Sequence, residues 1–284
     1  MKQQLILAGG GALLLASLFF FGKTAQKKAP MVMPAMGMMP AVPTFNVDTY
    51  LLAEKQKLPV YQSNYLDKTE NSVVRGDVTE QQIKVDNELA AFWKDSVKQA
   101  DLYIYYTGKA AELENTEKNL TFAAQLILQS LKGEQDPGKR GWKAEQAIGL
   151  FNQAIELDPN NDDLKVGLGS CYVFGKGMAG DAQETMKGVM QLLTVVQKDS
   201  TNMKAQLVLG IGGVISTQYD KAIDRLTTVV KNQPNNLEAI SWLADAYAGK
   251  GDKANAIKWY DISKRMVNDP EYSKEIDQRI KLLQ

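Results

Sequence analysis

The sequence predicts an all-α fold: a solenoid of stacked helix hairpins with an N-terminal transmembrane helix and a C-terminal capping helix. Apolar residues recur at helical spacing from about residue 47 onward, and strand-like alternation is nowhere sustained. Short segments repeat at intervals of 34 residues, and residues 5–22 carry no charge. We therefore expect each repeated segment to be a hairpin that covers the apolar flank of its neighbour.

Residues 1–28 are predicted to form a membrane anchor. Residues 5–22 lie between Lys2 and Lys23 and have the minimum length for spanning a bilayer. A cleaved signal peptide is the alternative, but cleavage needs small residues one and three places before the cut, and Lys23 spoils that pattern at Ala25. We favour an uncleaved single-pass anchor in a bacterial inner membrane. Lysines flank the run on both sides, so its orientation stays open, with a periplasmic repeat region favoured.

Residues 29–45 are expected to form an extended linker. Four prolines within residues 29–43 exclude a helix there. Five methionines within residues 31–39 offer thioether ligands of the kind that Cu(I) prefers. A copper-handling role for residues 31–39 is therefore the alternative to a plain stalk, although neither histidine nor cysteine strengthens such a site.

Composition argues against an enzyme. The chain has no histidine and a single cysteine, Cys171, so Ser-His-Asp and Cys-His nucleophiles, imidazole zinc sites and an internal disulfide are all excluded. A catalytic region in residues 44–117 would lack histidine, cysteine and clustered acids. The G-x-G-x-x-G pattern at Gly175–Gly180 follows a predicted helix rather than a strand, so it does not indicate a dinucleotide site. We expect no catalytic residue, cofactor or metal.

Charge argues against nucleic acid as a partner. The 33 basic and 33 acidic residues balance, but four lysines lie within residues 1–28, where no acid occurs. The remaining chain is therefore slightly acidic, and it has no electrostatic reason to bind phosphate backbones.

Residues 46–117 are predicted to be helical. Pro59 and the polar residues 71–77 interrupt the helical pattern. The predicted helices cover Val47–Lys57, Thr79–Lys98 and Asp101–Glu114. The last two form a degenerate repeat, because residues 109–115 resemble the repeat end at residues 153–159.

The repeat period is clearest near the C-terminus. Ala222 and Ala256 are one period apart, and so are the pairs Leu209-Gly210 and Leu243-Ala244. The interval from Leu168-Gly169 to Leu209-Gly210 exceeds this period by seven, which indicates an insertion. Comparison of the flanking segments places this insertion between residues 172 and 188.

These units resemble the tetratricopeptide repeat (TPR), in which a large residue, Leu-Gly, an aromatic, Ala, an aromatic and Pro recur over two helices. The best unit carries Leu243-Ala244, Tyr247, Ala256, Tyr260 and Pro270. The resemblance implies a right-handed α-solenoid of a membrane-anchored bacterial type over residues 118–284. Its units cover about 118–161, 162–202, 203–236 and 237–270, followed by a capping helix, 270–284, with Tyr272, Ile276, Ile280 and Leu283 on one face.

The sequence also departs from the repeat pattern. Gly213 stands where an aromatic residue is expected. The unit that begins near residue 162 contains the insertion, and we expect residues 134–141 to lengthen the turn of the first unit.

The resemblance implies a scaffold that binds a protein or peptide in a concave groove lined by the first helix of each unit, in the assembly of an envelope or membrane-associated complex. TPR proteins that clamp a terminal carboxylate use Lys, Asn and Arg, whereas Val166, Ser170 and Leu207 stand here. An apolar or helical ligand is therefore expected. The alternative is that the Val47–Lys57 helix or the insertion fills the groove. The expected lining is Asp163, Val166, Ser170, Val173, Phe174, Lys204, Leu207, Ile211, Val214, Ile215, Glu238, Ser241 and Asp245.

Overall fold

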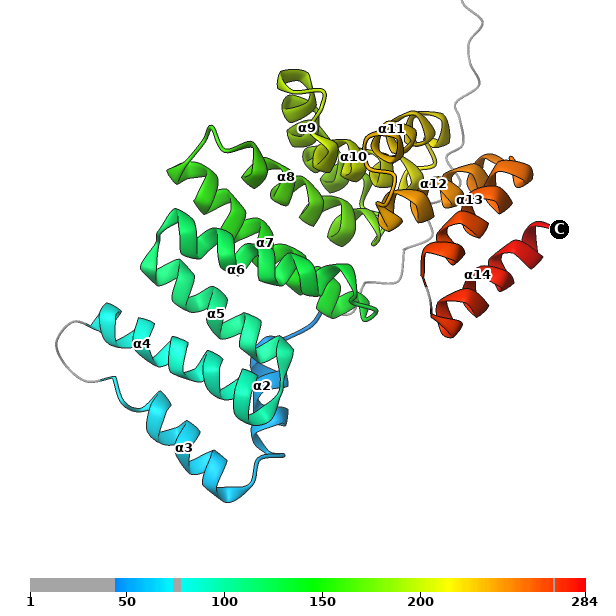
Figure 1. The fold of residues 1–284 in the computed structure, drawn as a ribbon. Coiled ribbons are helices and arrows are strands. Elements are labelled where there is room, and N and C mark those ends of the chain that lie inside the picture. Colours follow the sequence, from blue (N-terminus) through cyan, green and yellow to red (C-terminus); the bar gives the residue numbers. More distant parts are fainter. Residues whose placement is uncertain (1–43, 74–77, 268) are drawn as a thin grey trace, which may run out of the picture. The chain divides into compact units, whose positions relative to one another are not determined.

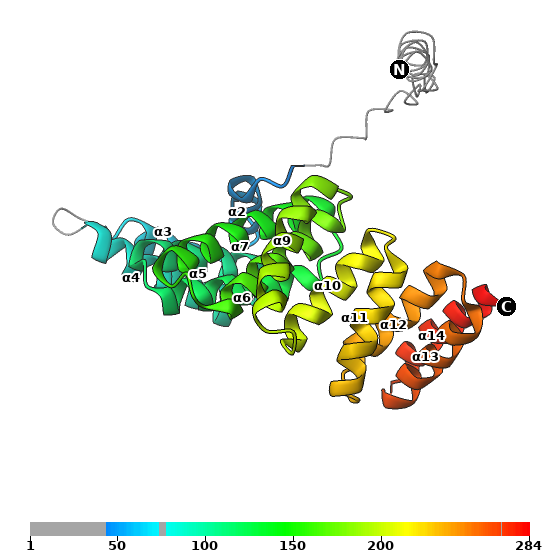
Figure 2. The same cartoon turned by 90° about the horizontal axis from the view of Figure 1, so that it is seen from above.

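The part of the chain that the structure describes is helical throughout (Figure 1). The computed structural model describes residues 44–73, 78–267 and 269–284, all of which belong to one compact unit, Val42–Gln284. Figures 1 and 2 show the helices from α3 to α14 following one another in chain order, each beside the next. This arrangement confirms the all-α solenoid of helix hairpins.

Five hairpins make up most of this unit. Each is a first helix packed against a second, and each second helix packs against the first helix of the next hairpin. The hairpins, numbered 1 to 5, are α4 (Val78–Ala91) with η1 (Phe92–Val97) and α5 (Ala100–Glu114); α6 (Glu117–Lys132) and α7 (Pro137–Leu157); α8 (Asp162–Cys171) with η2 (Tyr172–Gly177) and α9 (Ala182–Lys198); α10 (Met203–Ile215) and α11 (Tyr219–Asn232); and α12 (Leu237–Lys250) and α13 (Lys253–Met266).

Short polar side chains set where the helices begin. Asn202 and Asn236, which are one repeat period apart, cap α10 and α12 by accepting hydrogen bonds from backbone N–H groups three residues on, each at 3.0 Å. Asp181 and Asp252 cap the second helices α9 and α13 in the same way. These caps pair with backbone N–H groups that have no partner within the helix at its start. Because the caps recur with the repeat period, the helices begin at the same period.

The insertion lies in hairpin 3, where the repeat spacing places it. The first helix of this hairpin does not stop at Cys171 but continues through η2, a π-helix that ends at Gly177. The second helix, α9, has 17 residues, whereas α11 and α13 have 14 each. The extra residues therefore extend both helices and leave only a short turn between them.

The expectation of a long turn at residues 134–141 is wrong. Pro137 begins α7, and Asp136 caps it by accepting a hydrogen bond from the backbone N–H of Lys139 at 2.8 Å. Proline is favoured in the first turn of a helix because its φ is already helical and its missing N–H costs nothing there. The glycines at 138 and 141 therefore continue the helix.

Glycines bring the two helices of a hairpin together. A Cβ atom on Gly169 would lie 2.5 Å from Cγ of Leu192, and one on Gly210 would lie 2.7 Å from Cγ of Leu226. Both distances are shorter than real Cβ contacts, so the leucine of the second helix fills the space that the glycine leaves. The small residues of the repeat pattern thus allow the two helices of a hairpin to pack closely.

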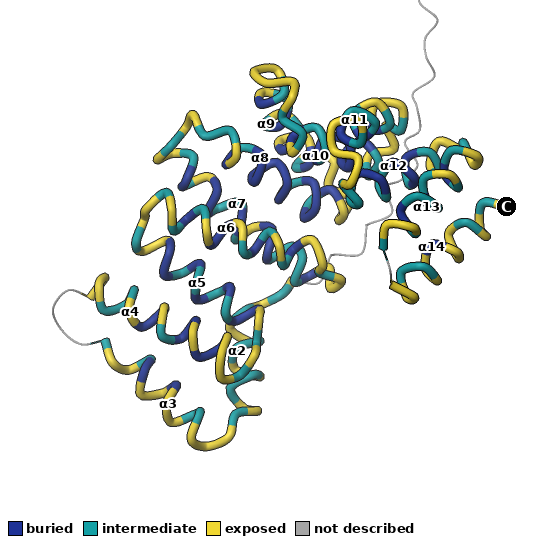
Figure 3. Tube along the Cα trace, in the orientation of Figure 1, coloured by how far each residue is buried: buried dark blue, intermediate teal, exposed yellow. Residues whose placement is uncertain are grey.

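The two ends of the unit are closed by additional helices. At the C-terminal end, α14 (Pro270–Leu283) packs on α13, with Ile276 buried and Tyr272, Ile280 and Leu283 half-buried against the same core, as the capping face predicts. At the other end lie α2 (Val47–Lys55) and α3 (Val60–Glu70). The sequence did not predict α3, which buries only Leu66 and Thr69 (Figure 3).

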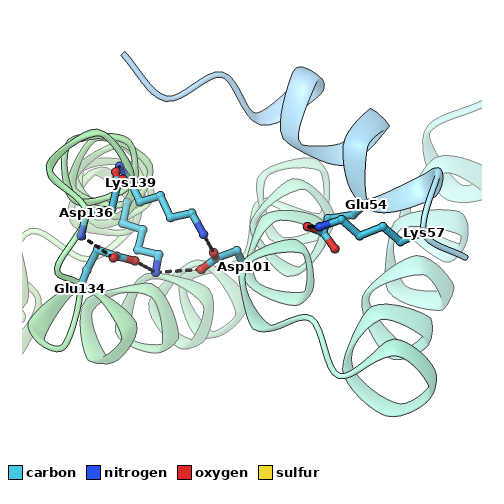
Figure 4. A network of polar contacts seen from close by, with 7 residues as sticks. Glu54, Lys57, Asp101, Glu134, Asp136 and Lys139 are labelled. Carbon is cyan, nitrogen blue, oxygen red and sulfur yellow. Dashed lines mark hydrogen bonds and ion pairs between the residues drawn. The ribbon is translucent and has the colours of Figure 1, made fainter. Parts of the chain in front are cut away.

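A polar network joins the first two hairpins (Figure 4). Asp101 on α5 pairs with Lys139 at 2.6 Å and with Lys143 at 2.8 Å, and both lysines lie on α7. Lys143 also pairs with Glu134 at 2.6 Å, and the ammonium of Lys139 lies 4.5 Å from the ring centre of Tyr50 on α2. Helix α2 is thus held against the second helices α5 and α7.

Within residues 44–73, 78–267 and 269–284, no helix combines the length and apolarity needed to cross a membrane. The predicted anchor at residues 5–22 and the methionines of residues 31–39 lie outside the described residues.

Candidate functional site

Five of the residues expected to line the concave groove are buried in the core. They are Val166, Ser170, Val173, Phe174 and Ile211, each at most 6 % exposed. The four apolar ones belong to one core cluster, and the hydroxyl of Ser170 donates to the backbone carbonyl of Val166 at 2.8 Å. In this structure these side chains offer no surface to a partner.

The chain itself covers this region. The ammonium of Lys132, at the end of α6, lies 4.6 Å from the ring centre of Phe174 on η2 and 3.1 Å from Glu238 Oε1 on α12. This ion pair connects hairpins 2 and 5 across the ring of Phe174. Phe174 belongs to the insertion, whereas α2 lies elsewhere, with the ring of Phe45 packed 5.1 Å from that of Trp142 on α7. The insertion, rather than the Val47–Lys57 helix, contributes to filling the region.

The other expected groove residues are half-buried or contact other residues of the chain. Lys204 pairs with Asp163 at 2.9 Å on the surface, and Leu207, Val214 and Ile215 are half-buried. At the C-terminal end, α14 covers the remaining positions. Its Tyr272 hydroxyl lies 3.0 Å from that of Ser241, and its Arg279 lies 2.9 Å from Asp245, which also accepts from Tyr260. Among the expected residues, only Ile215 lines the cavity described next.

An apolar cavity of about 420 Å³ opens between hairpins 3 and 4. We call it the α9–α11 groove. Met186, Val189 and Leu193 form one wall on α9, one helical turn apart from each other. Residues of α10 form the floor, and the first two turns of α11 form the other rim. The principal floor and rim residues are Leu209, Gly212, Gly213, Ile215, Lys221 and Arg225.

The groove arises where the chain departs from its own repeat. Gly213 occupies the position that Tyr172 holds in hairpin 3 and Tyr247 in hairpin 5, where each ring packs against a core cluster shared with the preceding hairpin. No ring fills this place in hairpin 4. A Cβ on Gly213 would lie only 3.1 Å from that of Ala222, so α10 and α11 approach too closely for a larger residue.

The lengthened α9 supplies the rest of the groove. Its early residues Ala182, Thr185 and Met186 line the opening. Met186 is 51 % exposed and Met190, on the same helix but outside the groove, is 62 % exposed. Unbranched, polarisable methionine side chains adapt to varied apolar ligands, so exposed methionine beside an apolar hollow is typical of polypeptide-binding surfaces.

A second, more open hollow of about 780 Å³ lies between α3 and the end of α4. Tyr61 and Tyr65 line it, and the ring of Tyr65 stacks on that of Phe92 at 5.3 Å. Glu88 and Asp95 are at its edge.

Metal-binding side chains do not gather in the described residues. No set of three or more cysteine, aspartate or glutamate side chains is placed there to hold a metal ion. Cys171 is buried between hairpins, and burial raises the pKa of its thiol well above the ordinary value, which keeps it protonated.

The fold is that of a helical-repeat protein. Residues 216–271, which contain α11, α12 and α13, match the tetratricopeptide repeat family, as the spacing of Ala222 and Ala256 predicted. This part of the chain is made of tetratricopeptide repeats, and the neighbouring hairpins continue the same packing. No curated protein matches the chain.

Several solved structures resemble the chain at low sequence identity. YrrB, described as a TPR protein with an unusual peptide-binding site, is 16% identical; the match covers 76% of this chain and 97% of YrrB, with a TM-score of 0.44. MamA from Desulfovibrio magneticus RS-1 is 15% identical, with coverage of 68% and 97% and a TM-score of 0.46. A tetratricopeptide repeat protein from Parabacteroides merdae is 14% identical, with coverage of 81% and 86% and a TM-score of 0.42.

Proposed function

We propose that this chain is a non-enzymatic scaffold that binds a segment of another polypeptide in the α9–α11 groove. The observation that carries the proposal is the apolar hollow of about 420 Å³ between hairpins 3 and 4, where Gly213 stands in place of the aromatic residue found in hairpins 3 and 5. Apolar hollows bordered by a few polar groups are the usual binding sites of proteins, and helix-lined grooves accept peptide segments through regularly spaced apolar contacts.

The groove replaces the concave surface as the expected binding site. Val173, Phe174 and Ile211 are buried, and Lys132 and Glu238 pair across Phe174, so a partner at those positions would have to displace the chain's own contacts. The α9–α11 groove needs no such displacement, because Met186 is already exposed at its edge.

We also propose that residues 5–22 anchor the scaffold in a bacterial inner membrane, where it assists assembly of a membrane-associated complex. The support is the absence of charge from residues 5–22 and the proline-rich linker that follows. Fractionation of cells tests this part alone. The full chain should stay in the membrane pellet through a high-salt wash, and a chain lacking residues 1–28 should be released.

Two methionines on one helix provide a matched test of the groove. A photo-crosslinking amino acid is placed at Met186, which lines the groove, or at Met190, which lies outside it and is somewhat more exposed. Irradiation of intact membranes should yield a discrete crosslinked polypeptide from position 186 only. That product should disappear when Ile215→Glu is added, while the circular dichroism spectrum is retained. Identical crosslinks from both positions, or none from 186, would remove the groove as the binding site.

A further inference from the structure

Two cations on one face of α11 border the α9–α11 groove. Lys221 and Arg225 are four residues apart, which places them one above the other on the helix, and both line the groove. Arg225 is half-buried, and its Nη1 donates a hydrogen bond to Gln206 Oε1 at 2.7 Å. The ammonium of Lys221 donates to Gln218 Oε1 at 2.9 Å. Both partners are neutral, and neither cation pairs with a carboxylate among the described residues.

The acids on the helices around the groove are engaged elsewhere or point away. Asp181 caps α9, Glu184 pairs with Lys187 at 2.5 Å, and Asp220 pairs with Lys250 at 2.7 Å. Asp224 is exposed and directly precedes Arg225, so the helical turn of about 100° per residue directs it away from the Arg225 face. Helix α10 carries no acid.

This arrangement leaves Arg225 partly desolvated without a counter-ion. Burial lowers the pKa of its guanidinium, and no neighbouring charge acts in the other direction. A partly buried charge that has only a neutral partner has lost hydration without gaining an ion pair. A carboxylate brought to the rim would supply that pair, and a guanidinium binds a carboxylate through two parallel hydrogen bonds.

Resting on the proposed function, we infer that the occupant of the α9–α11 groove is an acidic, apolar segment of another polypeptide. Its aspartate or glutamate side chains pair with Arg225 and Lys221, and its apolar side chains lie against Met186 and Val189. The apolar wall and the cationic rim face each other across the groove, so the segment presents one apolar edge and one acidic edge. An apolar segment without acids leaves Arg225 unpaired, and a basic one is repelled.

In a groove that clamps a terminal carboxylate, the binding residues lie on the first helices of the hairpins. The two cations described here lie elsewhere. Lys221 and Arg225 lie on the second helix of hairpin 4 and face α9. Because they are spaced by one helical turn, they suit two side-chain carboxylates spaced by one turn of a bound helix.

Selection of random peptides identifies the occupant's chemistry without knowledge of the partner. The full chain in detergent is presented with a displayed library of random peptides about 16 residues long, enough for four helical turns. Peptides that also bind Met186→Glu are discarded. We expect those retained to be enriched in aspartate and glutamate and depleted in lysine and arginine. Synthetic copies are made with amidated C-termini, so that only side-chain carboxylates remain.

Binding of these peptides is then measured against three charge variants on α11. Arg225→Gln should weaken binding at least tenfold, Lys221→Gln less, and Arg225→Lys should retain most of the affinity. Lys231→Gln, which removes a cation outside the groove on the same helix, should have no effect. Affinity for wild type should fall as salt is raised, because part of the pairing is at an exposed rim. Thermal unfolding verifies that each variant folds.

The outcomes separate the inference from the proposed function. If every selected peptide still binds the Met186→Glu variant, the groove does not bind polypeptides and the proposed function fails. If groove-dependent peptides are recovered without enrichment in acids, or if Arg225→Gln and Lys231→Gln behave alike, the groove stands and its preference for acidic segments is overturned.

Discussion

The ammonium nitrogen of Lys143 lies 2.8 Å from Oδ1 of Asp101, and the two side chains are only 4% and 12% exposed. The pair joins α7 of hairpin 2 to α5 of hairpin 1, and Glu134 provides a second carboxylate at 2.6 Å from the same nitrogen. Burying a charged side chain is costly unless it is paired, and the two carboxylates supply partners for this deeply buried lysine. The network of Figure 4 is therefore the main polar connection between the first two hairpins.

We predict that Asp101→Asn lowers the free energy of unfolding by about 2 kcal/mol, because Lys139 and Lys143 then lose a charged partner in a partly buried site. Chemical denaturation measures the change. Asp163→Asn is the matched control, since its pair with Lys204 is exposed and should contribute less than about 0.5 kcal/mol. Equal effects of the two substitutions would show that burial of the network has no energetic consequence.

The same network predicts loss of stability in acid. Burial would raise the pKa of Asp101, but hydrogen bonds from Lys139 and Lys143 hold it below its ordinary value. The pKa of Glu134 is likewise lowered by Lys143 and the backbone N–H of Asp136, against the effect of burial. A lowered pKa stabilises the folded state fully above the unfolded-state value near 4, and this contribution disappears as pH falls through the folded-state value.

Denaturation between about pH 7 and pH 2.5 tests this sign. The free energy of unfolding of the wild type should fall more steeply below pH 4 than that of Asp101→Asn. Parallel pH profiles would mean that Asp101 titrates alike in the folded and unfolded chain.

Asp86 is predicted to lower the stability of the fold as pH rises, which is the opposite of the effect of Asp101. Its side chain is fully buried on α4, Oδ2 has no hydrogen-bond partner, and Lys109 is 3.7 Å from Oδ1. Burial raises the pKa of Asp86, and Lys109 and Gln82 only partly oppose this. The folded state therefore retains the proton to higher pH than the unfolded state, and stability declines as pH rises through the unfolded-state value and up to the folded one.

Asp86→Asn removes this penalty, so the variant should gain stability relative to wild type on going from about pH 3 to pH 7. Asp67→Asn, which alters an exposed carboxylate on α3, is the control. A loss of stability at pH 7 would show that the pair with Lys109 outweighs the desolvation of Asp86.

Gly169 should tolerate no methyl group. Gly169→Ala is expected to cost about 2 kcal/mol, because the new Cβ would lie 2.5 Å from Leu192 Cγ in a close-packed core. Combining it with Leu192→Ala should cost less than the sum of the two single changes, since the smaller residue makes room for the methyl group. Gly149→Ala on α7 has nothing within 4 Å of the added Cβ and should instead stabilise by about 0.5–1 kcal/mol. Additive single and double changes would rule out the proposed contact.

The spacing of short segments was enough to predict the hairpins. Helices α10 and α12 begin one repeat period apart because their asparagine caps recur with that period. Helices α11 and α13 also begin one period apart, and their buried alanines, Ala222 and Ala256, recur with it. The insertion in hairpin 3 and the capping face around Ile276 were also readable, since both follow from helical periodicity alone. The departure at Gly213 was visible in the sequence as well, although the hollow that it leaves was not.

The accessible surface, in contrast, was decided by tertiary packing. Of the expected groove residues, Val173 and Phe174 lie in η2, whereas Val166 and Ser170 lie on α8 and Ile211 on α10. All five are buried whichever kind of helix carries them. Val173 and Phe174 enter a core to which Leu131 of α6 belongs, and the ammonium of Lys132 lies over the ring of Phe174.

By itself, the sequence determined the helices, their pairing and their order, because these depend on neighbours a few residues apart and on a repeated period. Which faces stayed open was settled only when α6, α9 and α12 came together, since exposure depends on side chains that are far apart in the chain. Lys132 and Glu238 are 106 residues apart, and the α9–α11 groove needs both the longer α9 and the bare backbone at Gly213. Such long-range contacts leave no periodic signal in the sequence.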